Sequence, residues 1–245
     1  MTSAAGPYTF VLVHGGRHGG WAWRPVAQRL RDGGHEVLTP TLTGLGERAH
    51  LLTRDVGLDT HINDLVATFE FEDLEDVVLV AHSYAGMPVA GAMDRIGTRV
   101  RRLVFVDARI PYSGESILDL TGSELASTFL EMVNRDGDGW FVPNSDATWW
   151  GLTDPDQIAW VNTKTTPQPM KSYTDHVDSA DLAWTHPGTF IQCNPSHITD
   201  REVERLRARA ARDDHFHLRQ LNACHDAMLT APDELTQLLL EAAEI

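Results

Sequence analysis

The sequence has few cysteines, few basic residues and no long apolar run. Only 2 of its 245 residues are cysteine, and Cys193 and Cys224 are too far apart for a metal knuckle, so we expect free thiols. Lys and Arg number 20 against 35 Asp and Glu, a formal net charge of −15, whereas nucleic-acid binders need a basic face. No stretch approaches the roughly 18 apolar residues of a membrane span. These absences exclude nucleic-acid and membrane partners and favour a small molecule.

The remaining composition is that of an ordinary globular chain. Hydrophobic residues make up 42% and charged residues 22%, which suits one α/β domain of this length. The first residues, MTSAAGPYTFVLVHGG, lack the basic segment and the apolar run of a secretory signal. We therefore expect a cytoplasmic protein and leave a homodimer open.

Short apolar runs alternate with amphipathic segments along most of the chain. Continuous apolar strands between such helices are typical of a parallel sheet covered on both faces, so we predict the α/β class. The expected helices cover residues 21–32, 58–71, 88–96 and 200–212 and begin again near Pro232. The expected strands cover residues 8–13, 36–40, 76–81, 102–106, 189–193 and 217–221.

The alternation stops between residues 112 and 187, where the sequence reads as irregular. Because the sheet needs both flanks to be complete, we expect a core of residues 1–111 and 188–245 with an insertion of residues 112–187, not a second domain. The insertion holds five of the seven tryptophans, Trp140, Trp149, Trp150, Trp160 and Trp184, together with Phe129, Met132, Phe141 and Met170.

The sharpest local pattern is VVLVAHSYAG, residues 77–86. A buried strand runs into Ser83 and a helix follows, which is the context of a nucleophile elbow that exposes a serine hydroxyl above the sheet edge. Ala81 and Ala85 stand where glycine is usual, and both are small enough for the tight turn. The alternative is a serine that only caps the helix.

Two further features accompany this serine in the chain order of a serine hydrolase. His225 follows the last predicted strand, where such enzymes place the base. After the first strand, His14-Gly15-Gly16 lets the backbone approach a ligand, so the amides of Gly16 and Tyr84 are the predicted oxyanion donors.

The other late histidines predict neither a base nor a metal site. We interpret His197, His215 and His217 as surface or edge histidines. His215 and His217 lack a third ligand, so we expect no metal and no cofactor.

Four segments, VLVHGGRHGGWAW, TPTLTGLGER, LVAHSYAGMPVAG and CHDAMLTAPDEL, resemble the α/β-hydrolase superfamily. They are most similar to the branch that contains plant methylesterases, hydroxynitrile lyases and small bacterial esterases. This resemblance implies an α/β-hydrolase fold with a lid inserted between the sixth and seventh strands. It also implies Ser83 as nucleophile, His225 as base, and Gly16 and Tyr84 as oxyanion donors.

Two positions depart from the lyase members of that branch. These carry threonine after the first-strand histidine and lysine after the catalytic histidine. Here the two positions are Gly15 and Asp226, so we do not expect cyanohydrin cleavage.

The acid that would orient the imidazole is less clearly marked. The resemblance implies an aspartate soon after TFIQC, but Ser196 stands near that place. Asp107, at the end of the strand RLVFV, is the first candidate, because some members of the superfamily supply the acid from there. Asp200 is the second candidate, although it also looks like a helix cap. The remaining alternative is another group or no acid at all.

Together these patterns predict a serine hydrolase that cleaves a carboxylic ester, lactone or thioester through an acyl-enzyme. The aromatic insertion predicts an apolar pocket without a cationic cluster, suited to neutral esters of hydrophobic or aromatic acids. Two alternatives stay open. One is cofactor-free cyclisation, C–C cleavage or oxygenation on the same scaffold, and the other is a catalytically silent binding module.

Overall fold

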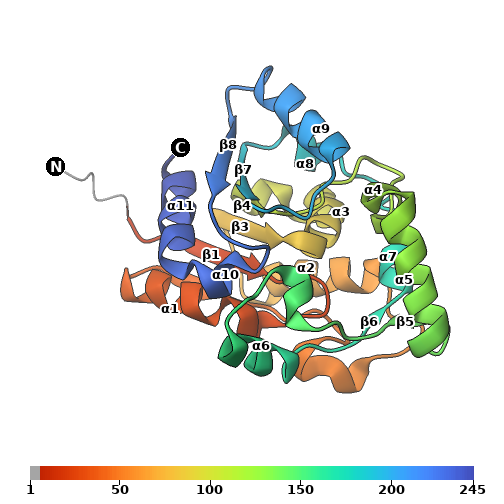
Figure 1. Cartoon of the computed structure of the whole chain (residues 1–245). Helices are drawn as coiled ribbons and strands as arrows, with labels where there is room; N and C mark the ends of the chain where they lie inside the picture. Colours follow the sequence, from red (N-terminus) through yellow and green to blue (C-terminus); the bar gives the residue numbers. More distant parts are fainter. Residues whose placement is uncertain (1–5) are drawn as a thin grey trace.

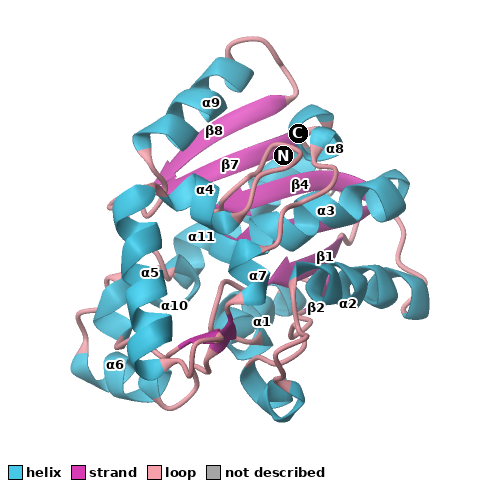
Figure 2. Cartoon of the chain, turned by 90° about the vertical axis from the view of Figure 1, so that its right-hand side faces the viewer, coloured by secondary structure: helices cyan, strands magenta, loops and turns pink. Residues whose placement is uncertain are grey.

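The computed structural model describes residues 6–245 and is built on a six-stranded sheet in the order β2-β1-β3-β4-β7-β8. Every neighbouring pair in this sheet is parallel. The predicted α/β-hydrolase sheet is confirmed, and Figure 2 shows its strands side by side. The strands are β1 (Thr9–Val13), β2 (Glu36–Leu38), β3 (Val77–His82), β4 (Val100–Val106), β7 (Gly188–Cys193) and β8 (Phe216–Leu221).

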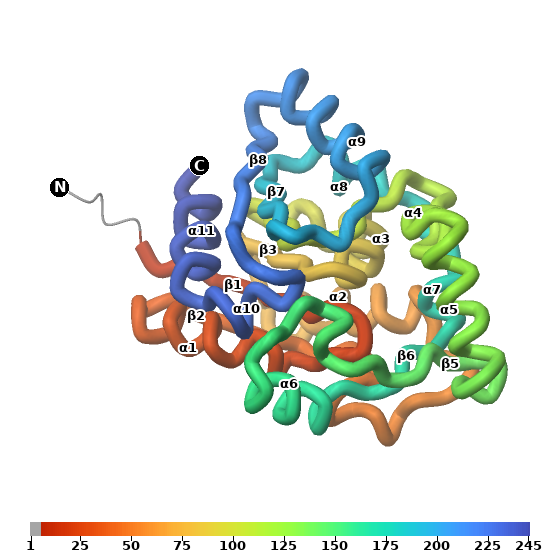
Figure 3. The backbone as a smooth tube through the Cα atoms, viewed as in Figure 1, coloured from red at the N-terminus to blue at the C-terminus, as the bar shows by residue number. Residues whose placement is uncertain are grey.

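Helices cover both faces of this sheet (Figure 1). Alternate side chains of each strand point to opposite faces, so Val78 and Val80 pack toward α1 and α11, whereas Leu79 and Ala81 pack toward α2 and α3. Figure 3 shows the C-terminal α10 and α11 against the N-terminal α1. The helices are α1 (Arg24–Asp32), α2 (Leu58–Phe71), α3 (Gly86–Ile96), α8 (Asp181–Thr185), α9 (Asp200–Ala210), α10 (Ala227–Thr230) and α11 (Pro232–Glu244).

The segment between β4 and β7 corrects two sequence expectations. About half of it is helical, where an irregular segment was expected. It joins the fourth and fifth strands of this sheet, not the sixth and seventh, because the described sheet has six strands. Its helices are mostly short and are separated by Gly- and Pro-containing segments such as Gly137-Asp138-Gly139 and Pro167-Gln168-Pro169, which make the sequence read as irregular. Its elements are α4 (Ile117–Thr121), α5 (Ser123–Asp136), β5 (Phe141–Val142), α6 (Pro155–Asn162), β6 (Gln168–Pro169) and α7 (Lys171–Thr174), followed by α8.

Within residues 6–245, no helix has the length and apolar character needed to cross a membrane. Short 3-10 turns complete the description at Gly20–Trp23, Gly46–Leu51, Ser83–Ala85, Gly97–Arg99 and Ala147–Trp150.

Candidate active site

Ser83 occupies a strained turn between β3 and α3. Its φ is +54°, in the left-handed region that a non-glycine residue rarely adopts. Ala81 and Ala85, on either side, are fully buried. The small flanking residues let strand and helix meet closely, so the turn presents the Ser83 side chain at the carboxyl edge of the sheet.

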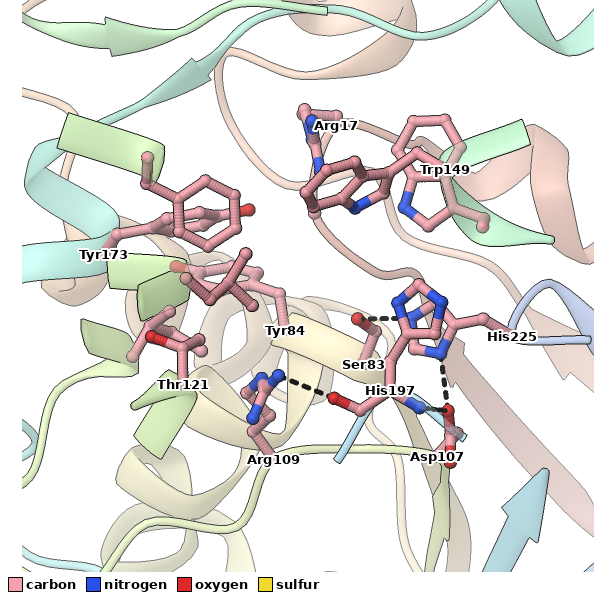
Figure 4. A pocket seen from close by; sticks show the side chains of 15 residues that line it. Arg17, Ser83, Tyr84, Asp107, Arg109, Thr121, Trp149, Tyr173, His197 and His225 are labelled. Atoms are coloured by element: carbon pink, nitrogen blue, oxygen red, sulfur yellow. Dashed lines mark hydrogen bonds and ion pairs between the residues drawn. The ribbon is translucent and has the colours of Figure 1, made fainter. Parts of the chain in front are cut away.

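His225 lies between Ser83 and Asp107 (Figure 4). The Ser83 hydroxyl donates a hydrogen bond to Nε2 of His225 over 2.8 Å. On the other side of the ring, Nδ1–H donates to Oδ2 of Asp107 over 2.6 Å. A carboxylate can only accept, so Asp107 places the ring hydrogen on Nδ1 and leaves Nε2 free to accept the serine proton.

Asp107 is fully buried but well supplied with hydrogen-bond donors. Oδ2 also accepts from the amide of His197 at 2.9 Å, and Oδ1 accepts from the Ser196 hydroxyl. Burial alone would raise the pKa of the carboxyl, but the bonds from His225, Ser196 and His197 outweigh it and hold the pKa at about 2. The group is therefore a carboxylate at neutral pH.

The second acid candidate, Asp200, lies on the surface at the start of α9. Asp200 is the first, exposed residue of α9, and the cap of that helix is Thr199, which accepts from the amide of Glu202. The expectation that Asp200 caps the helix is therefore wrong. Ser196, which stands near the position expected of an acid, instead donates to the carboxylate of Asp107.

The backbone of the loop after β1 passes very close to the Ser83 turn. A Cβ at Gly15 would lie 2.7 Å from Nδ1 of His82 and 3.0 Å from Cβ of Ser83. At Gly16 it would lie 2.6 Å from the Tyr173 hydroxyl. No side chain fits at either position without displacement, so glycine brings this backbone beside the serine. Gly16 and Tyr84 both line the pocket that Ser83 faces.

His14 fixes the peptide group that carries the Gly16 amide. The amide of Leu42 donates to Nε2 of His14 at 3.1 Å, so the ring hydrogen is on Nδ1, which donates to the Gly15 carbonyl at 2.8 Å. Burial lowers the pKa of His14 to about 3, although the Gly15 carbonyl opposes this shift. The neutral ring therefore orients the Gly15–Gly16 peptide.

A second buried histidine links the loop after β1 to the residue following His225. His18 contacts the Gly16 carbonyl through Nδ1 at 2.8 Å and Oδ2 of Asp226 through Nε2 at 3.0 Å. Both His18 and Asp226 are almost completely buried. This bridge holds the Gly16 loop and the His225 loop at a fixed separation.

The pocket over Ser83 is partly aromatic, but it also contains cations. Trp149 and Trp150 line it, whereas Trp140, Trp160 and Trp184 do not. The sequence predicted an apolar pocket without a cationic cluster, but two arginines, Arg17 and Arg109, lie in its wall. The apolar and aromatic lining is completed by Ile117, Leu125, Phe129, Tyr84 and Tyr173.

Sequence reasoning missed two histidines of this site. His197, expected to be a surface or edge histidine, stacks on His225 with ring centroids 4.2 Å apart and an interplanar angle of 11°. His82 donates through Nε2–H to the His225 carbonyl oxygen over 2.9 Å. His197 follows β7 at the same sheet edge as the other site residues, and that placement was the available signal.

Across residues 6–245, no cluster of three or more His, Cys, Asp or Glu side chains could hold a metal ion. The site combines a serine hydroxyl, an imidazole and a carboxylate with the nearby backbone of Gly16 and Tyr84, which is the set of groups that nucleophilic acyl transfer needs.

Sequence comparison gives the family and the relatives of this chain. Residues 10–238 match the alpha/beta hydrolase family. A carbendazim-hydrolysing esterase of Nocardioides sp. is 42% identical over 174 residues, covering 67% of this chain and 70% of that protein. Methylesterase 10 of Arabidopsis thaliana is 27% identical over 259 aligned residues, covering 96% of this chain and 91% of the relative.

Solved structures give the same fold at lower identity. An extracellular alpha/beta-hydrolase from a Paenibacillus species superposes with a TM-score of 0.82 at 21% identity, over 96% of this chain and 99% of the other. The family match spans nearly all of the described residues and includes every strand end that carries a candidate site residue. The chain therefore belongs to the alpha/beta hydrolase family.

Proposed function

We propose that the protein is a serine esterase whose nucleophile, base and acid are Ser83, His225 and Asp107. The observation that carries this proposal is the pair of hydrogen bonds on the His225 ring, 2.8 Å to Ser83 and 2.6 Å to Asp107. Its esterase relatives support the same reaction class.

In the proposed mechanism, Nε2 of His225 takes the Ser83 proton as Oγ attacks the ester carbonyl. The amides of Gly16 and Tyr84 stabilise the oxyanion, and the imidazolium protonates the departing alkoxide as the C–O bond breaks. His225 then deprotonates a water that attacks the acyl-enzyme, which releases the acid and restores Ser83.

We propose a small alkyl ester, such as a methyl ester, with an aromatic or apolar acyl part as the substrate. Two observations support this choice: the relatives include methylesterases, and Phe129, Trp149 and Tyr173 line the pocket. Residues 112–187 supply most of this aromatic lining, which supports a lid role for the insertion over a core of residues 1–111 and 188–245.

The non-hydrolytic alternative rested on an acid that is lost or relocated. Asp107 lies within hydrogen-bond distance of His225, so an acid is present, and the esterase relatives support hydrolysis over that alternative. A silent binding module would retain the pocket but turn over no ester, and the following experiment distinguishes it.

The test compares the wild type with Ser83→Ala on a p-nitrophenyl ester of a short acid. We expect wild-type turnover and a loss of at least about 10⁴-fold in kcat for the variant, because the acyl-enzyme can no longer form. A fluorophosphonate probe should label only the wild type. Full turnover by Ser83→Ala, or an unlabelled wild type that hydrolyses no ester, would contradict the proposal.

A further inference from the structure

Arg17 is a buried cation in the pocket wall, one residue beyond Gly16. Its side chain is only 3% exposed, and its backbone is held by Gln168 and Thr166 of the insertion. The guanidinium carbon lies 4.9 Å from the ring centroid of Trp150 and 5.9 Å from that of Trp149. Figure 4 shows Arg17 beside Trp149 at the end of the pocket remote from Asp107.

No carboxylate of the described chain lies within 4.0 Å of the Arg17 guanidinium. Its hydrogen-bond partners are neutral: the Ser145 hydroxyl accepts from Nη1, and the Tyr173 hydroxyl also accepts from the guanidinium. Nε is buried without a partner. Burial lowers the pKa of Arg17, and Tyr173 and Asp226 act in the opposite direction. Asp226 is already bonded to His18 through Oδ2.

The second pocket arginine, Arg109, does have a carboxylate partner. Arg109 donates to Glu202 at 2.6 Å and to the His197 carbonyl at 2.8 Å. A buried guanidinium without an anionic acceptor is costly, because desolvation is not offset by pairing. Arg109 has an anionic acceptor, Glu202, inside the protein, whereas Arg17 has none within the described residues.

We propose that Arg17 binds a carboxylate of the substrate. The inference rests on the proposed esterase function and narrows its substrate class to aromatic or apolar esters that carry a second, free carboxylate. A planar guanidinium fits a carboxylate through two parallel hydrogen bonds, and the flanking tryptophan rings hold that plane in place. The ester carbonyl would lie at Ser83 and the carboxylate at Arg17, with the apolar lining between them.

Two matched substrates test the proposal: monomethyl esters of benzene-1,3- and 1,4-dicarboxylic acid, each against the same ester with a neutral carboxamide in place of the free acid. The readout is the ratio of kcat/KM between acid and amide. We expect the wild type to prefer the acid by about 10- to 100-fold, the range of a hydrogen-bonded charge. In Arg17→Met the ratio should fall to near one, mainly through KM, and Arg17→Lys should retain part of it.

Arg54→Met is the matched control. Arg54 also lies over a tryptophan, Trp140, at 5.5 Å, but it does not line the pocket, so its ratio should equal that of the wild type. Thermal midpoints report whether each variant folds. A wild-type ratio near one, or an unchanged ratio in Arg17→Met, would overturn the role of Arg17.

Failure of the proposed function gives a different result, since no ester would then be turned over at all. Binding of the same acid and amide to Ser83→Ala, measured by calorimetry, still decides the role of Arg17 in that case. The inference is supported if Ser83→Ala binds the acid more tightly than the amide and if this preference disappears in the double variant Ser83→Ala/Arg17→Met. Equal binding of the two compounds contradicts it.

Discussion

Asp107 supplies a buried negative charge through several donors at once. It accepts from a ring nitrogen, a hydroxyl and a backbone amide that come from His225, Ser196 and His197. These donors fix the position of the carboxylate as well as its charge, so Asp107 can hold the His225 ring in a single tautomer.

We expect Asp107→Asn to lower kcat by about 10³- to 10⁴-fold while leaving KM for a neutral ester little changed. The neutral amide cannot stabilise the imidazolium and can donate to Nδ1, which favours the wrong tautomer. Steady-state kinetics on a p-nitrophenyl ester measure the effect. Asp200→Asn is the control and should remain within about twofold of the wild type. A variant Asp107→Asn with more than a tenth of wild-type kcat would argue against this role.

The site residues differ in how far the sequence could predict them. Ser83, Asp107 and His225 each follow a strand, so a rule about strand ends was enough to select them, and the structure brings them together. The same rule left Asp107 and Asp200 as alternatives, because sequence cannot show which carboxylate faces the ring. The pocket cation Arg17 was missed, because its burial depends on tryptophans more than 130 residues away in the chain.

At the scale of elements, the start of α3 is pressed against the chain that leaves β4. A Cβ at Gly86 would lie 2.0 Å from the carbonyl oxygen of Arg109, and the Arg109 amide donates to the Ser83 carbonyl at 3.1 Å. The strand that carries Asp107 is therefore held directly against the turn that carries Ser83, and only glycine permits the contact.

We expect Gly86→Ala to reduce the free energy of unfolding by more than about 2 kcal/mol, since backbone atoms must separate to admit the methyl group. Gly97→Ala, at the other end of α3, is the matched control. Its Cβ would lie 3.3 Å from a flexible methionine methyl, so stability should stay within about 1 kcal/mol of the wild type. Urea unfolding of the wild type and both variants measures these free energies. Equal stability of the two would contradict the packing argument.

Sheet elements were predicted better than the insertion. Residues 77–81 of β3 and 103–106 of β4 are buried on both faces, so each reads as a continuous apolar run. The predicted ends of these strands differ from the structure by no more than two residues. Helix α5 has 14 residues, but only Phe129 and Val133 are buried. Its position depends on packing over the pocket, where Leu125 and Phe129 form part of the lining.

At the scale of the whole molecule, several histidines are buried in neutral form. Burial lowers the pKa of both His14 and His82 to about 3, against 6.5 for an exposed ring. Below pH 6.5 the unfolded chain binds protons at these positions and the native protein does not. Stability contributed by the neutral rings is therefore lost as the pH falls from about 6.5 toward 3.

For His14 and His82 together, we expect the free energy of unfolding to drop by about 4 kcal/mol between pH 7 and pH 5. Asp107 adds to the loss only below its unfolded pKa of 3.8. Urea titrations across this range measure the change, and repeating them in high salt separates desolvation from screened surface charge. A free energy that stays constant within about 1 kcal/mol would contradict the expectation.

The site is assembled from loops that follow four different strands, with Gly16 after β1, Ser83 after β3, Asp107 after β4 and His225 after β8. The β8 strand is the last to be synthesised and lies at the edge of the sheet. In a nascent or refolding chain, His225 cannot reach Ser83 until β8 has joined the sheet, however complete the inner strands are. Under the proposed mechanism, recovery of esterase activity during refolding therefore requires this edge strand to be in place.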